Sequence, residues 1–197
     1  MLVHMVRIRP AEAADAHAVA QVRAQTWLTA YAGVIPDQVL AELTTPEAVC
    51  REAHWRAEHS MDGVLIAETT GRDAIAGPTP AADAAEVIGF ASFGPERGED
   101  DLLGQPMPGP ADEDRAELYA VYVLPQHSSS GVGRALLDRA LALAAEAGYA
   151  DISVWVLERH ERGRRFYEQA GFAGTGETAA LSRLGGVIGV RLRRLVG

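Results

Sequence analysis

The chain has 197 residues, of which 48% are hydrophobic and 23% charged, and its net charge is −9 at pH 7. This length suits one buried core. The acidic balance argues against a nucleic-acid backbone as the main partner and mildly favours a cationic small molecule or a basic peptide. No apolar run approaches the roughly 20 residues of a membrane helix, and the first residues lack the apolar core of a signal peptide. We therefore expect a cytoplasmic protein with a single domain over residues 1–197 and no membrane contact.

The single cysteine, Cys50, excludes an internal disulfide and any cysteine-based metal site. We expect it to be a buried structural thiol. The histidines form no metal-ligand pattern, so the sequence predicts no bound metal.

The N-terminal part predicts one strand followed by three helices. The strand lies around Val6–Arg9, and the helix after it places Val19 and Val22 on one face. A turn at Gly33–Pro36 precedes a second helix. A third helix is predicted in the segment TTPEAVCREAHWRAEH, because Pro46 stands at a permitted first-turn position.

The rest of the chain predicts strands interspersed with two helices. Strands are expected where apolar and β-branched residues run together: 63–69, 86–94, 117–123, 151–157 and a final pair joined at Gly185–Gly186. One helix follows the strand at 117–123 and stops at Gly148, and the next stops at Gly171. Two stretches rich in glycine and proline, at 71–85 and 94–116, predict long loops.

This order predicts an α/β fold with a mixed, mostly antiparallel sheet of about six to seven strands and helices on both faces. The strands at 117–123 and 151–157 flank one helix, which favours a right-handed crossover between a central parallel pair. The C-terminal segment VIGVRLRRLV could supply an edge strand or an exchanged strand to a homodimer.

The segment LPQHSSSGVGRALL runs from a predicted strand, through small residues, into a helix. Gly131 and Gly133 allow conformations closed to other residues, and the first amides of a helix have no intrahelical partner and favour an anion. The loop therefore suits a pyrophosphate, although glycines and serines are also common in turns that join a strand to a helix. Leu136 stands where a dinucleotide fingerprint has its third glycine, and no Gly-Lys pair forms a Walker loop. The core positions of the following helix are Leu136, Leu137, Ala140, Leu141 and Ala144.

Two runs, AELYAVYVLPQHSSSGVGRALLDRAL and VWVLERHERGRRFYEQAGF, together resemble the GCN5-related N-acetyltransferase (GNAT) superfamily over residues 116–172. That family has a strand, Gln/Arg-x-x-Gly-x-Gly/Ala and a helix, followed by a strand, an Asn-x-x-Ala element and Phe-Tyr-x-x-x-Gly-Phe. Ser128 stands at the Gln/Arg position, His160 at the asparagine position and Gly163 at the alanine position. The resemblance implies a GNAT-like fold and direct transfer of acetyl from acetyl-CoA to a primary amine. The departures at Ser128 and His160 motivate an alternative, a non-catalytic module that binds or senses acyl-CoA.

The resemblance also implies where coenzyme A binds. The strand at 117–123 would present free backbone groups to the pantetheine arm, and the serine and glycine loop would bind the pyrophosphate. His160 and Arg164, further along the chain, would complete the site. The expected cofactor-binding residues are Val121, Tyr122, Val123, Ser128, Ser129, Ser130, Gly131, Val132, Gly133, Arg134, His160 and Arg164.

Two residues are predicted to carry the chemistry. Tyr167 occupies the family position whose hydroxyl lies near the thioester sulfur, so the resemblance implies that it donates the proton to the leaving thiolate. From the residues alone, Phe166 and Tyr167 could both simply pack in the core or at its boundary. Glu117 matches the base of the histone-acetylating branch of the superfamily, and alternation places it on the face of Val121 and Val123. A lone acid at the start of a strand also suits a solvated residue, and this alternative stays open.

The amine acceptor is undecided between a small molecule and a protein N-terminus or lysine. Trp27 and Tyr31, on the first helix, either form the wall of an acceptor pocket or fill the core.

Overall fold

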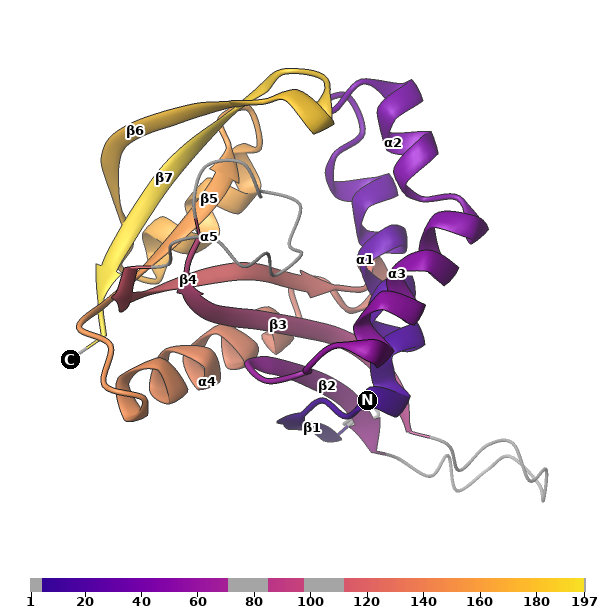
Figure 1. The fold of residues 1–197 in the computed structure, drawn as a ribbon, viewed down its shortest axis with the longest axis horizontal. Coiled ribbons are helices and arrows are strands. Elements are labelled where there is room, and N and C mark those ends of the chain that lie inside the picture. The colour runs from indigo at the N-terminus through magenta and orange to yellow at the C-terminus, as the bar shows by residue number, and fades with distance from the viewer. Residues whose placement is uncertain (1–4, 71–84, 98–111, 197) are drawn as a thin grey trace.

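The computed structural model describes residues 5–70, 85–97 and 112–196, and in these it forms one seven-stranded sheet with five α-helices (Figure 1). The strands are β1 (Met5–Pro10), β2 (Val64–Thr70), β3 (Glu86–Glu96), β4 (Asp112–Val123), β5 (Asp151–Leu157), β6 (Ala173–Leu181) and β7 (Val187–Leu195). The helices are α1 (Ala16–Ala30), α2 (Asp37–Leu43), α3 (Pro46–Glu58), α4 (Val132–Glu146) and α5 (Glu161–Gln169).

The order of the strands in the sheet is β1-β2-β3-β4-β5-β7-β6, and every neighbouring pair is antiparallel except β4 and β5, which are parallel. The predicted fold class and the central parallel pair are confirmed. One part of the prediction is wrong, because β7 is not an edge strand. A tight connection containing Gly185 and Gly186, both with positive φ, returns β7 between β5 and β6, and both of its edges are paired within the chain.

Two of the sequence boundaries also differ from the structure. The predicted loop at 94–116 is too long, because β3 extends to Glu96 and β4 starts at Asp112, where these two residues are partners. The sequence pattern missed these strand ends because their side chains are polar. Backbone pairing between strands does not require apolar side chains. The parts of the two predicted loops at 71–84 and 98–111 lie outside the described residues.

Helices cover both faces of the sheet (Figure 1). α1 packs on β3 and β4 from one face, with α3 against α1, and α4 packs on the other face. The predicted core positions of α4 are confirmed, because Leu136, Leu137 and Ala140 are fully buried in the main hydrophobic core with Ile66 and Ile88 of the sheet. This packing fixes where α4 begins, and therefore where the loop before it lies.

The parallel pair β4–β5 is short. Its last aligned residues are Leu118 and Val154, whereas β4 continues to Val123 and β5 to Leu157. The two strands therefore diverge in the middle of the sheet, and the opposed edges of their distal halves have no strand between them.

A β-bulge in β4 lies at the same point. Ser92 of β3 is opposite Ala120 and Phe93 is opposite Leu118, so that Tyr119 is an extra residue without a partner on β3. A bulge of this kind bends its strand and redirects the side chains beyond it.

The bulge makes one sequence expectation wrong. Simple alternation predicted Glu117 on the face of Val121 and Val123, but the extra residue reverses the alternation. The register puts Glu117 on the face of Tyr122 instead, with Val121 and Val123 on the opposite face. No periodicity in this strand indicates the bulge.

Among the described residues, no helix combines the length and the apolar character needed to cross a bilayer.

Candidate active site

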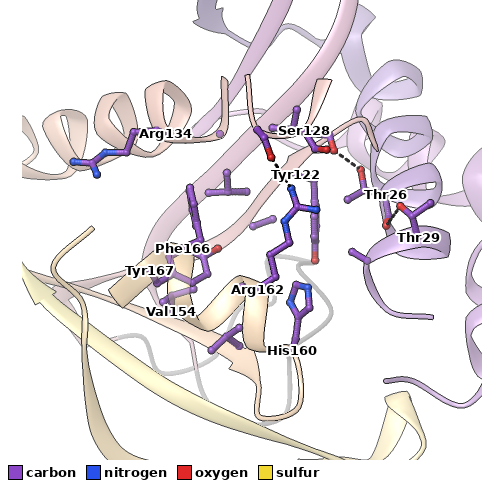
Figure 2. Close-up of a pocket in the computed structure, with 18 of the residues that line it drawn as sticks. Thr26, Thr29, Tyr122, Ser128, Arg134, Val154, His160, Arg162, Phe166 and Tyr167 are labelled. Carbon is purple, nitrogen blue, oxygen red and sulfur yellow. Dashed lines mark hydrogen bonds between the residues drawn. The ribbon is translucent and has the colours of Figure 1, made fainter. Parts of the chain in front are cut away.

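A cleft of about 670 Å³ opens where β4 and β5 diverge (Figure 2). Its walls come from the distal halves of these two strands, the C-terminal end of α1, the turn and loop before α4, and α5. The predicted site residues that line the cleft are Tyr31, Val121, Tyr122, Val123, Ser128, Ser129, Gly131, Gly133, Arg134, His160 and Tyr167.

The loop before α4 presents a row of free backbone donors to the cleft. The amide of Ser128 donates to the carbonyl of Pro125, and the amide of Ala135 donates to the carbonyl of Gly131 at 3.0 Å. The six amides between them, at 129–134, have no hydrogen-bond partner in the described parts of the chain. Because α4 is 15 residues long and its N-terminus carries the positive end of the helix dipole, these amides favour an anion.

The conformation of this loop depends on two residues with left-handed backbone. Gly131, the N-cap of α4, has φ 89°, which glycine adopts without a steric penalty. Ser129 has φ 63°, and among the described residues it is the one non-glycine with positive φ. Such strain is typical of functional loops, and the serine identity gave no warning of it.

Arg162 is a site residue that the sequence analysis missed. Its guanidinium reaches across the cleft and donates to the hydroxyl of Ser129 at 3.3 Å (Figure 2). Arg164, which we expected near the phosphates, lies outside the cleft lining and pairs along α5 with Glu168 at 3.7 Å. Side chains two positions apart on a helix project in different directions, so the correct arginine depends on the exact start of α5.

Three tyrosine hydroxyls gather in the cleft. The hydroxyls of Tyr31 and Tyr122 lie 3.2 Å apart, and Tyr167 is buried against Phe166 and Phe172. Burial raises the pKa of Tyr31, Tyr122 and Tyr167 above the ordinary tyrosine value. All three hydroxyls are therefore protonated at neutral pH and can act as proton donors.

His160 joins this aromatic group from the start of α5. Its ring contacts the ring of Tyr31 edge-on, with centroids 5.1 Å apart, and it lines the cleft. Burial, with a smaller contribution from the charge of Arg162, lowers the pKa of His160 below its usual 6.5.

Some predicted site residues lie outside the cleft. Glu117 is 1% exposed, and its carboxylate accepts hydrogen bonds from the backbone amide and the guanidinium of Arg97, at 3.0 and 2.6 Å. Trp27 packs in a small core cluster with Ile35 and Leu40, so of its two sequence interpretations the structure supports the core. The remaining predicted residues outside the lining are Ser130, Val132 and Arg164.

Cys50 does not fit its expected role. It is exposed on α3, because the side of the helix that packs on α1 carries Val49 and Ala53, whereas we expected a buried thiol. It is absent from the cleft lining, and the described residues contain no group of three or more potential metal ligands.

Two threonines of α1 are further cleft residues that the sequence analysis did not identify. Thr26 donates to the carbonyl of Val123 at 3.2 Å, and Thr29 lies one turn further along the helix (Figure 2). The Thr26 bond ties α1 to the diverging end of β4. Thr26 is buried and Thr29 is exposed, so a polar residue on the buried face of a helix is a signal that could have found Thr26.

Comparison with known proteins agrees with this geometry. Residues 39–172 match the model of the Acetyltransferase (GNAT) family. The chain belongs to this family. Curated GNAT relatives include the N-acetyltransferase YuaI of Bacillus subtilis (strain 168), which is 31% identical over 79% of this chain and 74% of its own length. The N-acetyltransferase Rv2775 of Mycobacterium tuberculosis (strain ATCC 25618 / H37Rv) is 27% identical over 96% of this chain and 94% of its own.

Solved GNAT structures share the fold. The acetyltransferase yncA of Salmonella typhimurium, solved with acetyl-CoA, is 22% identical with a TM-score of 0.65 over 98% of this chain and 94% of its own. The PaiA N-acetyltransferase of Thermoplasma acidophilum, solved with coenzyme A, is 19% identical with a TM-score of 0.59. The match covers 95% of this chain and 98% of that protein's own. Family and relatives together identify the chain as an acyl-CoA-dependent N-acetyltransferase.

Proposed function

We propose that this GNAT protein is a single N-acetyltransferase domain that transfers the acetyl group of acetyl-CoA directly to a primary amine. The observation that carries the proposal is that one cleft contains both the free amides of 129–134 and the buried hydroxyl of Tyr167. An anion site and a proton donor on one cleft are the two elements that transfer from a phosphate-bearing thioester requires.

The residues present fit coenzyme A. The amides of 129–134 would bind the pyrophosphate, with Arg162 adding a cation beside them. The edge of β4 at Val121–Val123 would pair with the amides of the pantetheine arm, because no strand occupies the space between the distal halves of β4 and β5. Within this edge the carbonyl of Val123 already accepts a hydrogen bond from Thr26. When bound, acetyl-CoA supplies an activated acetyl group.

Tyr167 would donate its proton to the departing sulfur. Its hydroxyl is protonated at neutral pH because burial raises its pKa, and it lines the cleft. Direct transfer agrees with the position of Cys50 on α3, outside the cleft lining, where an acyl-cysteine would have no access to the acceptor.

The alternative, a non-catalytic acyl-CoA sensor, rests on Ser128 and His160 at positions where the family has other residues. One experiment separates the two. The protein is incubated with acetyl-CoA and a panel of primary amines while free thiol is measured, and coenzyme A binding is measured in parallel by thermal shift. Thiol release above the rate without enzyme supports the transferase. Binding without any release contradicts it and supports the sensor.

Arg162 provides a test of the cofactor site. Arg162→Ala should weaken acetyl-CoA binding about 5- to 10-fold, which corresponds to about 1–1.4 kcal/mol for loss of a partly solvated charge-assisted contact. The matched control is Arg164→Ala on the same helix, which should change affinity less than about twofold because Arg164 lies along α5 beside Glu168. Calorimetric titration measures both affinities, and equal effects would contradict the assignment.

A further inference from the structure

The deprotonation of the acceptor is the step for which the cleft offers few groups. An alkyl ammonium has a pKa of about 10 and must lose a proton before it can attack a thioester. Among the described residues that line the cleft there is no aspartate or glutamate, and the two histidines, His127 and His160, are the candidates for a general base. Glu117 is held by Arg97 and does not line the cleft.

The two histidines lie at different ends of the cleft. His127 belongs to the turn that leads into the amide loop, where its carbonyl accepts a hydrogen bond from Ser130. His160 lies at the other end, away from Ser128 and Arg134, as Figure 2 shows, and contacts Tyr31. His160 is therefore on the side of the aromatic hydroxyls, and His127 on the side of the expected phosphates.

The backbone of α5 makes room for the ring of His160. A Cβ atom at Gly163 would come 2.4 Å from Nδ1 of His160 and 2.9 Å from Cε1, which is closer than real contacts allow. Glycine at 163 and histidine at 160 thus fit each other. The ring does not cap α5, and neither of its nitrogens has a hydrogen-bond partner in the part of the chain that the structure describes, so the ring is available to a ligand in the cleft.

We propose that His160 is the general base that accepts the proton of the acceptor ammonium, an inference that rests on the proposed acetyltransferase function. His160 takes one proton from R–NH₃⁺ and later releases it to solvent. The nitrogen lone pair then forms the C–N bond, the C–S bond breaks with its electron pair going to sulfur, and sulfur takes the proton of Tyr167. The second proton lost by the nitrogen returns to Tyr167, so R–NH₃⁺ and the thioester give the amide, the thiol and one proton.

The surroundings keep His160 neutral. Tyr31, the residue after α1, faces it, Tyr122 of β4 is bonded to Tyr31, and Arg162 is the nearby cation on α5. The apolar Val156 of β5 lies beside Gly163. Burial and the charge of Arg162 lower its pKa, so the ring can accept a proton at pH 7. Because the protonated ring is inactive, we expect the acid limb of the rate profile at a pH below 6.5.

The test is His160→Asn, which restores the residue usual at this position in the family. At pH 7 the turnover should fall about 10- to 100-fold, within the usual contribution of a general base. The acid limb should disappear, and the rate should rise with pH toward the pKa of the acceptor amine, about 10. Acetyl-CoA affinity, measured by calorimetry, should change less than about twofold. Proton NMR of the free wild-type protein should give His160 a pKa below 6.5.

Two further variants separate catalysis from packing. The double variant His160→Asn/Gly163→Ala restores the asparagine–alanine pair of the family. If the ring only fills space, this variant regains the wild-type rate and profile, and the proposal fails. If His160 is the base, the double variant stays slow with the profile of His160→Asn. His54→Asn, an exposed histidine on α3, is the control and should leave the profile unchanged.

The failures of the two proposals are distinguishable. No thiol release by the wild-type protein with any amine would overturn the acetyltransferase function. An active wild type whose His160→Asn variant keeps the same acid limb would overturn the role of His160 alone.

Discussion

Replacing Tyr167 with phenylalanine should lower turnover about 100- to 1,000-fold, within the range for loss of a positioned acid. The variant keeps the ring that packs against Phe166 and Phe172 and removes the hydroxyl that would protonate the leaving sulfur. Acetyl-CoA affinity should stay within about twofold, because no contact with the amide loop is lost. Steady-state kinetics with one amine and calorimetric titration of the donor measure the two quantities.

Tyr149→Phe is a suitable control for this variant. Tyr149 lies beyond the C-terminal end of α4 and does not line the cleft, so the loss of its hydroxyl should leave turnover unchanged. A Tyr167→Phe variant with wild-type turnover would remove this hydroxyl from the mechanism. A variant that loses donor binding and turnover together would assign Tyr167 to binding instead.

The features that sequence predicted well are those set by local chemistry. The buried positions of α4 follow from the helical periodicity of its apolar residues. Gly131 and Gly148 stand where the chain needs a positive φ, at the start and just after the end of this helix. The free amides before α4 follow from the lack of intrahelical partners at a helix N-terminus. The strand–helix–strand order around α4 predicted the parallel pair β4–β5. These constraints act between residues that are close together in the chain, so they can be recognised from a single sequence.

The features that sequence did not predict depend on contacts between distant segments. The bulge at Tyr119 reverses the face of Glu117, and Arg97, which holds Glu117, comes from the end of another strand. The choice of Arg162 over Arg164 depends on which side of α5 faces the amide loop. Such facts follow from tertiary packing and leave no periodic signal in the chain.

The ion pair between Arg97 and Glu117 should be a strong determinant of stability. The two side chains are 7% and 2% exposed, and the guanidinium of Arg97 also stacks on the ring of Tyr119, 3.8 Å from its centroid. Arg97→Leu leaves a buried carboxylate without its cation and should lower the free energy of unfolding by about 3–5 kcal/mol. Urea denaturation measures this loss, because the midpoint and the slope of the transition together give the free energy of unfolding in water.

The double variant Arg97→Leu/Glu117→Leu removes both charges and should recover most of that stability, because replacing a buried pair with apolar residues is often neutral. The difference between the double variant and the sum of the single variants gives the coupling between the two side chains. An Arg97→Leu variant within about 1 kcal/mol of wild type would show that the carboxylate does not need its partner. The position of Glu117 outside the cleft lining would be unchanged, but the ion pair would no longer explain why a glutamate is buried there. A large decrease in the free energy of unfolding of Arg97→Leu would instead assign Glu117 a structural role. The proton transfer would then require a group that lines the cleft.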